Sequence, residues 1–571
     1  MNFTIHGGNA NSKITVTEKT ACDGVIELSV NYLLAQKEIP QEFDVHFSVP
    51  NIDIYSSWSP SMIWNRVIGK NYDWKRTDSR LASWMPLQSV ISGTGKNRVC
   101  VALSDAATPT AIFSGVAEED AEIKWMIRFF TQPTTAISEY NATIRIDVRD
   151  VPFYDSIYET VSWWENECGY TPAPVPEHAR LPMNSLWYSF HQNLVPDEIV
   201  KQCKLSKPLG MESVIIDDGW QTNDSNRGYA YCGDWESVRI PDMKGLVDRI
   251  HDTGMKVILW YSVPFVGVHA KRFDEFRDFL LDLDDSTEDV RRLDPRYKHV
   301  REYLIETYAK AVEEWGLDGL KLDFIDSFCL TEDSIKPDHR RDFESLEEAI
   351  DQLMVSITER LQGINPDIMI EFRQSYVGPS IRKYGNMMRV MDCPTDAPFN
   401  RRGIIDLRFT SGSTAVHSDM LMWNLADTKE GVAGQLASVI YGVPQISMLI
   451  DKLPRDHYET LKYYLSFWRE HRDILLDGDF SAEGPESFYN QACACKDGEA
   501  IVTVYNNNVV SGEYEKLVVV NASASEFVYL KNMAGKSYRV VDCMGQETMC
   551  GMVEGNICEI GVFRGGMIFI R

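Results

Sequence analysis

The strongest constraint on the fold is a change of hydrophobic period near residue 184. From there to about residue 450, short apolar runs alternate with amphipathic stretches, and we count eight of each. The apolar runs, which we predict to be strands, cover residues 184–190, 212–220, 256–262, 319–326, 367–374, 387–393, 414–420 and 443–450. Eight strand-then-helix units in roughly 250 residues are typical of a (β/α)8 barrel. An open doubly wound sheet is the rival, but it usually has fewer strands and a glycine-rich phosphate loop after the first.

Two β-rich segments flank the predicted barrel. Residues 1–165 carry short alternating runs rich in Val, Ile, Thr, Phe and Tyr, which predict an N-terminal β-sandwich. Residues 166–183 include a proline-rich run and read as a linker. The barrel then extends over 184–475, and the alternation that returns over 476–571 predicts a closing antiparallel β domain. A multidomain chain is expected, since 571 residues are too many for one hydrophobic core.

Composition narrows the class of partner. With 57 basic and 84 acidic residues the formal net charge is −27, which argues against nucleic acid and anionic membranes and suits a neutral substrate. The N-terminal residues alternate and are polar, so no leader peptide is visible, and no apolar run is long enough for a membrane span. The 12 cysteines are scattered, which predicts reduced thiols in a cytoplasmic protein. We expect no cofactor and no metal ion.

Polar residues gather at the carboxyl ends of the predicted strands, which form the active-site face of such a barrel. They are acids, aromatic rings and a few cations: Trp187, His191, Asp217, Asp218, Trp220, Trp260, Lys321, Asp323, Asp326, Glu371, Arg373, Arg389, Asp392, Asp396, His417 and Asp419. Carboxylates and cations bind sugar hydroxyls, while tryptophan rings cover the apolar face of a sugar. The set therefore predicts a carbohydrate site.

Simpler explanations exist for most of these residues. A lone aspartate after a strand is often a helix N-cap, and the Asp217–Asp218 pair before Gly219 equally fits a turn. Trp187 and Trp260 fit barrel packing. Asp323 is the hardest to explain in this way. It lies in phase with Lys321 on a strand and so points to the barrel axis, where burying a carboxylate without a partner or a role is costly.

The motifs around these residues resemble one family along almost the whole barrel. They are IIDDGWQ (215–221), GDWE (233–236), PDMKGLVDRIHDTGMKVILWY (241–261), LDPR (293–296), GLDGLKLDF (316–324) and RVMDCPTDAPFNR (389–401). In this order they resemble the α-galactosidases of glycoside hydrolase family 36, and more distantly family 27. The resemblance implies a central barrel between an N-terminal β-sandwich and a C-terminal β domain, and retaining exo-hydrolysis of terminal α-linked galactose.

The resemblance also implies two catalytic roles. Asp323, in the segment Lys321-Leu322-Asp323, matches the family's nucleophile, with Lys321 on the sugar hydroxyls. Asp392 matches the acid/base. Asp396 competes for that role, because the family often has one residue fewer between the two acids, but it fits the second, sugar-contacting position better. Retaining hydrolysis needs the two carboxyl groups about 5–5.5 Å apart.

Further sugar contacts follow from the same resemblance. Asp217 and Asp218 are implied to bind the 4-OH and 6-OH of galactose. The remaining residues that we assign to the sugar are Trp187, Trp220, Trp260, Arg373 and Arg389. From the residues themselves we expect Lys321 to lower the pKa of Asp323, and the surroundings of Asp392, including Asp396, to raise the pKa of that acid. Asp326 reads as a cap or as a supporting acid.

One departure from the family leaves the sugar open. Where family members carry a Cys/Gly-rich segment after the fifth strand, this sequence reads EFRQSYVGP (371–379), with Arg373 toward the mouth. An α-galactoside comes first, but an anionic galactoside or an α-N-acetylgalactosaminide suits an arginine. Trp58, Trp64 and Trp74 are candidates for contacts beyond the first sugar, with core packing as the alternative. A homo-oligomer fits the family.

Three other functions fit parts of the sequence. The same site with a sugar acceptor gives a transglycosylase similar to raffinose synthases. A metal-dependent barrel hydrolase would use His191, His417, Asp419 and the Asp217–Asp218 pair, although the usual His-x-His spacing is absent. A carbohydrate-binding protein with an inactive barrel comes last, since both catalytic acids are present.

Overall fold

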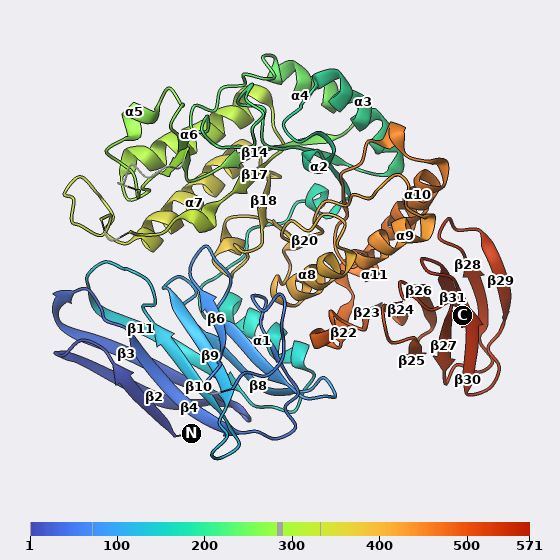
Figure 1. Cartoon of the computed structure of the whole chain (residues 1–571), viewed down its shortest axis with the longest axis horizontal. Helices are drawn as coiled ribbons and strands as arrows, with labels where there is room; N and C mark the ends of the chain where they lie inside the picture. The colour runs from blue at the N-terminus through green and yellow to red at the C-terminus, as the bar shows by residue number, and fades with distance from the viewer. Residues whose placement is uncertain (1, 71, 283–288, 332) are drawn as a thin grey trace.

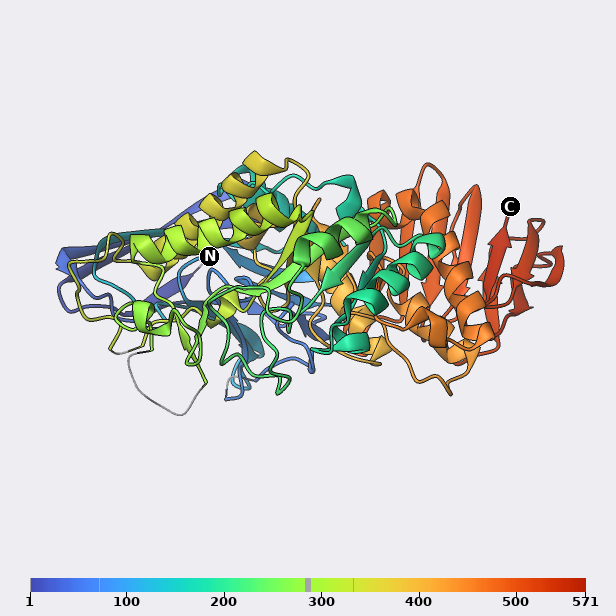
Figure 2. The ribbon, with the colours of Figure 1, turned by 90° about the horizontal axis from the view of Figure 1, so that it is seen from above.

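The computed structural model describes residues 2–70, 72–282, 289–331 and 333–571. A barrel stands between two β-rich regions, as predicted. The N-terminal sheets lie below the barrel in the view of Figure 1, and the C-terminal sheets project from its right-hand end in both views (Figures 1 and 2). The predicted fold class is confirmed, and the domain boundaries stay a prediction.

The central sheet is a parallel barrel of eight short strands. They are β12 (Met183–Ser185), β13 (Ser213–Ile216), β14 (Lys256–Ser262), β17 (Gly319–Asp323), β18 (Met369–Arg373), β19 (Met387–Arg389), β20 (Ala415–His417) and β21 (Gln445–Ile446). Their order is β20-β19-β18-β17-β14-β13-β12-β21. A parallel bridge from His417 to Val443 joins the two ends of the sheet. Most strands end before their predicted limits, so the residues beyond them form the mouth.

Helices cover the outside of the barrel. They are α3 (Pro196–Ser206), α4 (Met243–His251), α6 (Lys298–Trp315), α7 (Leu346–Ile364), α8 (Ala397–Thr410), α9 (Lys429–Ser438) and α10 (Arg455–Glu470). Two predictions were wrong here. Residues Trp187–Phe190, predicted as strand, form the short helix α2, and the segment from β18 to β19 holds only a 3-10 turn at Ile381–Lys383.

The N-terminal region and the linker that follows it take the place of the helix that is missing between β18 and β19. The Trp84 carbonyl lies so near Gly378 that a Cβ there would meet it at 2.5 Å, and the Ala173 N–H donates to the Arg382 carbonyl at 2.7 Å. Asn386 donates to the Pro174 carbonyl at 3.1 Å. The outer side of this segment is thus already covered, which leaves no room for a further helix.

The N-terminal sandwich has two antiparallel sheets, ordered β1-β4-β10-β9-β6 and β2-β3-β11-β8-β7-β5. The strands are β1 (Phe3–Gly7), β2 (Ser12–Cys22), β3 (Val25–Glu38), β4 (Phe43–Pro50), β5 (Ser56–Trp58), β6 (Lys75–Ser79), β7 (Leu87–Ile91), β8 (Asn97–Leu103), β9 (Thr110–Val116), β10 (Glu122–Phe129) and β11 (Ile137–Asp147). Stacked rings such as Phe47 and Trp125 fill its own core. The helix α1 (Phe153–Asn166) leads toward the barrel.

The C-terminal region has a seven-stranded and a three-stranded sheet. Its strands are β22 (Asp479–Glu483), β23 (Gln491–Lys496), β24 (Glu499–Val504), β25 (Val509–Ser511), β26 (Lys516–Asn521), β27 (Phe527–Lys531), β28 (Ser537–Val541), β29 (Glu547–Met552), β30 (Ile557–Gly561) and β31 (Met567–Ile570). Most pairs are antiparallel, but β24 pairs with β26, and β25 with β27, in parallel. In the described part of the chain no helix has the length and apolar character to cross a membrane, and the 12 cysteines carry free thiols.

A buried ion pair joins all three regions at one point. Arg66 of the N-terminal region donates to Asp406 on α8 at 2.5 Å, and the two side chains are 3% and 1% exposed. Tyr489 of the C-terminal region donates to the other Asp406 oxygen at 2.5 Å, and Arg66 also donates to the Pro485 carbonyl at 3.2 Å. Both oxygens of the buried carboxylate are therefore satisfied from outside the barrel.

Arg66→Met is expected to destabilise the protein strongly, because it leaves the Asp406 carboxylate buried with a single donor. We expect a loss of about 3–5 kcal/mol in the free energy of unfolding, measured by urea denaturation followed by tryptophan fluorescence. The matched control is Arg76→Met, which breaks the half-exposed pair with Asp78 and should cost at most about 1 kcal/mol. Equal effects of the two substitutions would contradict the structural importance of this junction.

Candidate active site

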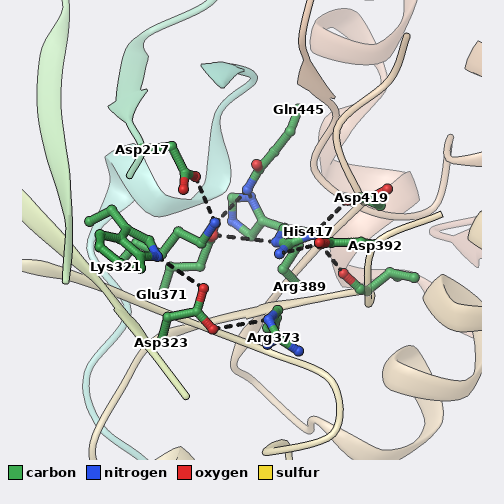
Figure 3. Close-up of polar contacts among 12 residues, drawn as sticks. Asp217, Lys321, Asp323, Glu371, Arg373, Arg389, Asp392, His417, Asp419 and Gln445 are labelled. Carbon is green, nitrogen blue, oxygen red and sulfur yellow. Dashed lines mark hydrogen bonds and ion pairs between the residues drawn. The ribbon is translucent and has the colours of Figure 1, made fainter. Parts of the chain in front are cut away.

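Asp323 is the last residue of β17, and four donors surround its carboxylate. Its Oδ1 accepts hydrogen bonds from the Phe324 N–H at 2.9 Å, from Arg373 Nε at 3.0 Å and from the Tyr376 hydroxyl. Its Oδ2 accepts from Trp260 Nε1 at 3.0 Å. Arg373 comes from the end of the neighbouring strand β18, and Figure 3 shows its guanidinium pointing to Asp323. The buried carboxylate is thus held in one orientation.

These donors decide the charge state of Asp323. Burial alone acts to raise the pKa of the carboxyl, but the positive charges of Arg373 and Lys321 and the hydrogen bonds from Tyr376 and Trp260 outweigh it. The pKa is held well below its ordinary value. Asp323 is therefore ionised at any physiological pH, in the direction that we predicted from Lys321, although Arg373 makes the larger contribution.

The Asp217–Asp218 pair follows β13 and lies beside Lys321. Lys321 Nζ donates to Asp217 Oδ2 at 2.7 Å. The two oxygens of Asp218 accept from the side-chain amides of Gln192 and Gln221, each at 2.6 Å. Burial raises the pKa of Asp218 to about 6. The pair is therefore part of one polar wall, rather than the chance product of a tight turn.

A second charge cluster surrounds Arg389, at the end of β19. Its guanidinium lies 2.5 Å from Asp419, 3.0 Å from Asp392 and 3.5 Å from Glu371 (Figure 3). Asp419 is also a buried acceptor for the Tyr188 hydroxyl at 3.0 Å and for the Cys393 N–H at 2.7 Å. One buried cation therefore fixes three carboxylates, and Asp392 is the one with an open side, at 51% exposure.

The pKa of Asp392 moves opposite to our prediction. Desolvation acts to raise it, but the charges of Arg389, Lys321 and Arg373 together lower it below the ordinary value. Asp396 does not help, since its side chain is the N-cap of α8 and accepts from the Phe399 N–H at 3.0 Å. In the same cluster, burial raises the pKa of Asp419 to about 6 and also raises the pKa of Glu371.

Three of the predicted sugar contacts lie too deep to touch a ligand in this arrangement. Trp220 is fully buried and packs against Trp235, Tyr261 and Trp315, on the helix side of the barrel wall. Trp260 and Arg389 are each 1% exposed. They act on other site residues instead, since Trp260 binds Asp323 and Arg389 binds the three acids. Trp187 is partly exposed at the mouth, with the Arg227 guanidinium 5.7 Å from its ring.

The three tryptophans predicted as possible sugar contacts in the N-terminal region differ in how far they are buried. Trp58 is fully buried and donates to the Tyr489 hydroxyl at 3.1 Å, so it is a core residue. Trp64 is 71% exposed and lies against Phe399, in the first turn of α8. Trp74 is half-buried beside Phe113.

Sequence reasoning missed four uncharged residues of the site. Tyr376 and the two glutamines Gln192 and Gln221 hold Asp323 and Asp218, and Tyr188 holds Asp419. Tyr376 lies three residues after Arg373, in the loop at a strand end, which was the available signal. Tyr188 fell inside a segment predicted as strand, which hid it.

The histidines do not assemble a metal site. His417 Nε2 lies 2.7 Å from the Ala179 carbonyl, and burial lowers the pKa of this histidine to about 4. His191 directly follows the short helix α2, and its ring packs against Trp187. Across the described ranges no group of three or more His, Cys, Asp or Glu is arranged to hold a metal ion.

Comparisons with known proteins agree with this fold. Residues 179–391 match the family model Melibiase. The α-galactosidase Mel36A of Lactobacillus acidophilus is 25% identical over 146 residues, which are 24% of this chain and 20% of that protein. The alignment thus spans only about a fifth of this relative's length. Residues 179–391, which hold the first six strands of the barrel, are thus similar to the melibiase family.

Solved structures extend the likeness to the whole fold. The galactosidase domain of the α-galactosidase–sucrose kinase AgaSK matches with a TM-score of 0.65 at 12% identity, over 100% of this chain and 85% of that one. A variant of the family 36 α-galactosidase AgaA from Geobacillus stearothermophilus, in complex with raffinose, matches with a TM-score of 0.64 at 13% identity, over 98% and 81%. The predicted resemblance to family 36 α-galactosidases is confirmed.

Proposed function

We propose that this protein is a retaining exo-α-galactosidase, with Asp323 as nucleophile and Asp392 as acid/base. The observation that carries the proposal is the contrast between the two carboxyl groups. Asp323 is buried, ionised and held by four donors, whereas Asp392 is half-exposed in the loop after β19, the next strand but one. A melibiase-type barrel and a family 36 structure in complex with raffinose support an α-galactoside as substrate.

The reaction would take two displacements at the anomeric carbon. In the first, an Asp323 oxygen attacks this carbon, the glycosidic C–O bond breaks, and Asp392 gives its proton to the leaving oxygen. In the second, Asp392 takes a proton from water, the water oxygen attacks the same carbon, and the bond to Asp323 breaks. Each step inverts the configuration, so the released galactose keeps the configuration of the substrate.

The polar wall supplies the sugar-binding groups. Asp217 and Lys321 form one charged pair next to Asp323, and Asp218 is braced by two amides, so their free lone pairs and protons are oriented before a sugar arrives. Orientation in advance lowers the entropic cost of binding hydroxyl groups. These side chains are nearly buried, which suits a closed pocket for one terminal sugar and therefore exo-hydrolysis.

The contacts of Arg373 weigh against an anionic sugar. Its Nε and Nη1 bind Asp323 and the Gln374 carbonyl, and its guanidinium lies over the rings of Phe324 and Tyr376 at 5.4 and 5.2 Å. The arginine is committed to the nucleophile and its loop. An α-N-acetylgalactosaminide remains the second candidate substrate, and transfer to a sugar acceptor the second candidate reaction. Asp323 and Asp392 would carry out all of these.

Azide will separate the two catalytic roles. With an activated galactoside such as nitrophenyl α-galactoside, Asp392→Ala is expected to accumulate the glycosyl-enzyme, which azide then attacks to give the α-galactosyl azide. Asp323→Ala leaves a gap where azide replaces the nucleophile, so the product is the β-galactosyl azide. Each substitution alone should lower kcat by about 100-fold or more. The configuration is read by proton NMR, and the same anomer from both variants would contradict the assignment.

A panel of nitrophenyl glycosides will test the sugar. We expect kcat/KM for the α-galactoside to exceed that for the α-glucoside by at least about 100-fold. The two sugars differ in the orientation of one hydroxyl, and polar groups of the site that bind it in one sugar are left unpaired with the other. Comparable rates on the two would defeat the galactose proposal, and a preference for the N-acetylgalactosaminide would select the second candidate. Product analysis at high raffinose concentration distinguishes hydrolysis from transfer.

The pH dependence follows from the direction of the Asp392 shift. Its folded pKa is lowered, so the protonated form that the first step needs is lost as pH rises through a value below the ordinary range. Between pH 5 and 7 we expect log kcat/KM to fall by about one for each pH unit. A plateau reaching to neutral pH would mean that substrate-free Asp392 holds its proton, contrary to its pairing with Arg389.

A further inference from the structure

The nucleophile is held by two loops, one after β17 and one after β18. The first begins at Phe324, whose φ of 66° is in the left-handed region that a bulky residue rarely adopts. The second follows Arg373, the last residue of β18, and carries Tyr376; both side chains bind the Asp323 carboxylate. The two loops are tied to each other, because Ser375 Oγ donates to Asp326 Oδ2 at 2.9 Å. Movement of either loop would reorient Asp323.

A turn of the N-terminal sandwich reaches both loops. Residues 80–85 connect β6 to β7. Arg80 donates through Nη1 to the Phe328 carbonyl at 2.5 Å and through Nη2 to the Asp326 carbonyl. The Trp84 N–H donates to the Ser375 carbonyl at 2.7 Å, and Trp84 itself has a φ of 55°. One turn, which connects the two sheets of the sandwich, therefore bonds the main chain of each loop that clamps the nucleophile.

The turn is built into the barrel, not merely laid on it. Leu81, Ala82 and Met85 are buried and belong to the hydrophobic cluster of the barrel, whereas the sandwich has a separate core. The left-handed φ of Trp84 costs on the order of 1–3 kcal/mol and persists only where the surroundings impose it. Packing of the three apolar side chains provides this constraint, so the turn offers Arg80 and the Trp84 N–H from a rigid support.

We propose that the turn at residues 80–85 of the N-terminal sandwich is a positioning element of the active site, with Arg80 as its principal residue. It acts through the main chain of Asp326, Phe328 and Ser375 to fix the loops that orient Asp323 for attack. Arg80 does not touch the carboxylate and takes no part in proton transfer. This role rests on the proposed function, and it assigns to the N-terminal region a share in catalysis rather than in stability alone.

The test compares Arg80→Met with two other variants of the full-length protein. Arg80→Met keeps the aliphatic length and removes both hydrogen bonds, and Arg80→Lys restores a cation that can make one of them. The matched control is Arg98→Met, which breaks ion pairs with Asp53 and Asp150 within the sandwich at similar exposure. The readouts are kcat and KM on nitrophenyl α-galactoside, and the rate at which a fluorogalactosyl fluoride labels Asp323.

For Arg80→Met we expect kcat and the labelling rate constant to fall by about tenfold or more with KM nearly unchanged, because a misplaced nucleophile slows attack without weakening sugar binding. Arg80→Lys should recover part of this loss, and Arg98→Met should match the wild type. A wild-type labelling rate constant in Arg80→Met overturns the proposal, even if fewer molecules become labelled, since that pattern means partial unfolding. An equal loss in Arg98→Met overturns it too.

Two further results have a stated meaning: an Arg80→Met variant that does not fold, and a wild type that is inactive. If Arg80→Met does not fold, Ser375→Ala removes the link between the two loops and is held to the same readouts, with wild-type kinetics counting against the proposal. If the wild type cleaves no glycoside of the panel and is not labelled, the proposed function fails and the positioning role falls with it. An active wild type with an equally active Arg80→Met overturns the positioning role alone.

Discussion

The site depends on keeping one carboxylate charged inside a protein interior. Asp323 lies where burial favours its neutral form, and a neutral acid is a poor nucleophile. Arg373 and Lys321 reverse this preference through their charges, and Tyr376 and Trp260 do so through hydrogen bonds. Since these partners come from β14, β17, β18 and the loop after β18, the carboxylate has its required state only when the barrel has closed around it.

The charged partners compete with the second catalytic requirement. The cations that keep Asp323 ionised also lower the pKa of Asp392, and among the nearby positive charges Arg389 lowers it most. The same electrostatic field that suits a nucleophile therefore opposes a proton donor. Asp392 is nevertheless half-exposed, so a bound glycoside that covers it would remove water from its open side and raise its pKa. Proton supply and substrate binding are coupled in such an arrangement.

Periodicity and composition were sufficient for the architecture. The eight apolar runs each contain a strand of the barrel, and the acids at their ends do gather at one mouth. The sequence did not show how deeply each side chain is buried or which residues it contacts. Trp220 and Arg389 are at strand ends like Asp323, but side-chain direction and the packing of neighbouring helices place them inside the wall. The pKa of Asp392 is lowered mainly by Arg389, three residues before it. The sequence does not show how close the guanidinium and the carboxylate lie.

The junction of Arg66, Asp406 and Tyr489 bears on how a gene of this kind can be rearranged. Each region supplies one member of a buried group in which Arg66 balances the charge of Asp406 and the Tyr489 hydroxyl binds the second carboxylate oxygen. A recombinant with the N-terminal region of a distant homologue would leave the Asp406 carboxylate buried without its cation, and one with a foreign C-terminal region would leave one of its oxygens without a donor. The three regions are therefore constrained to change together, and the barrel is not a module that can be transplanted alone.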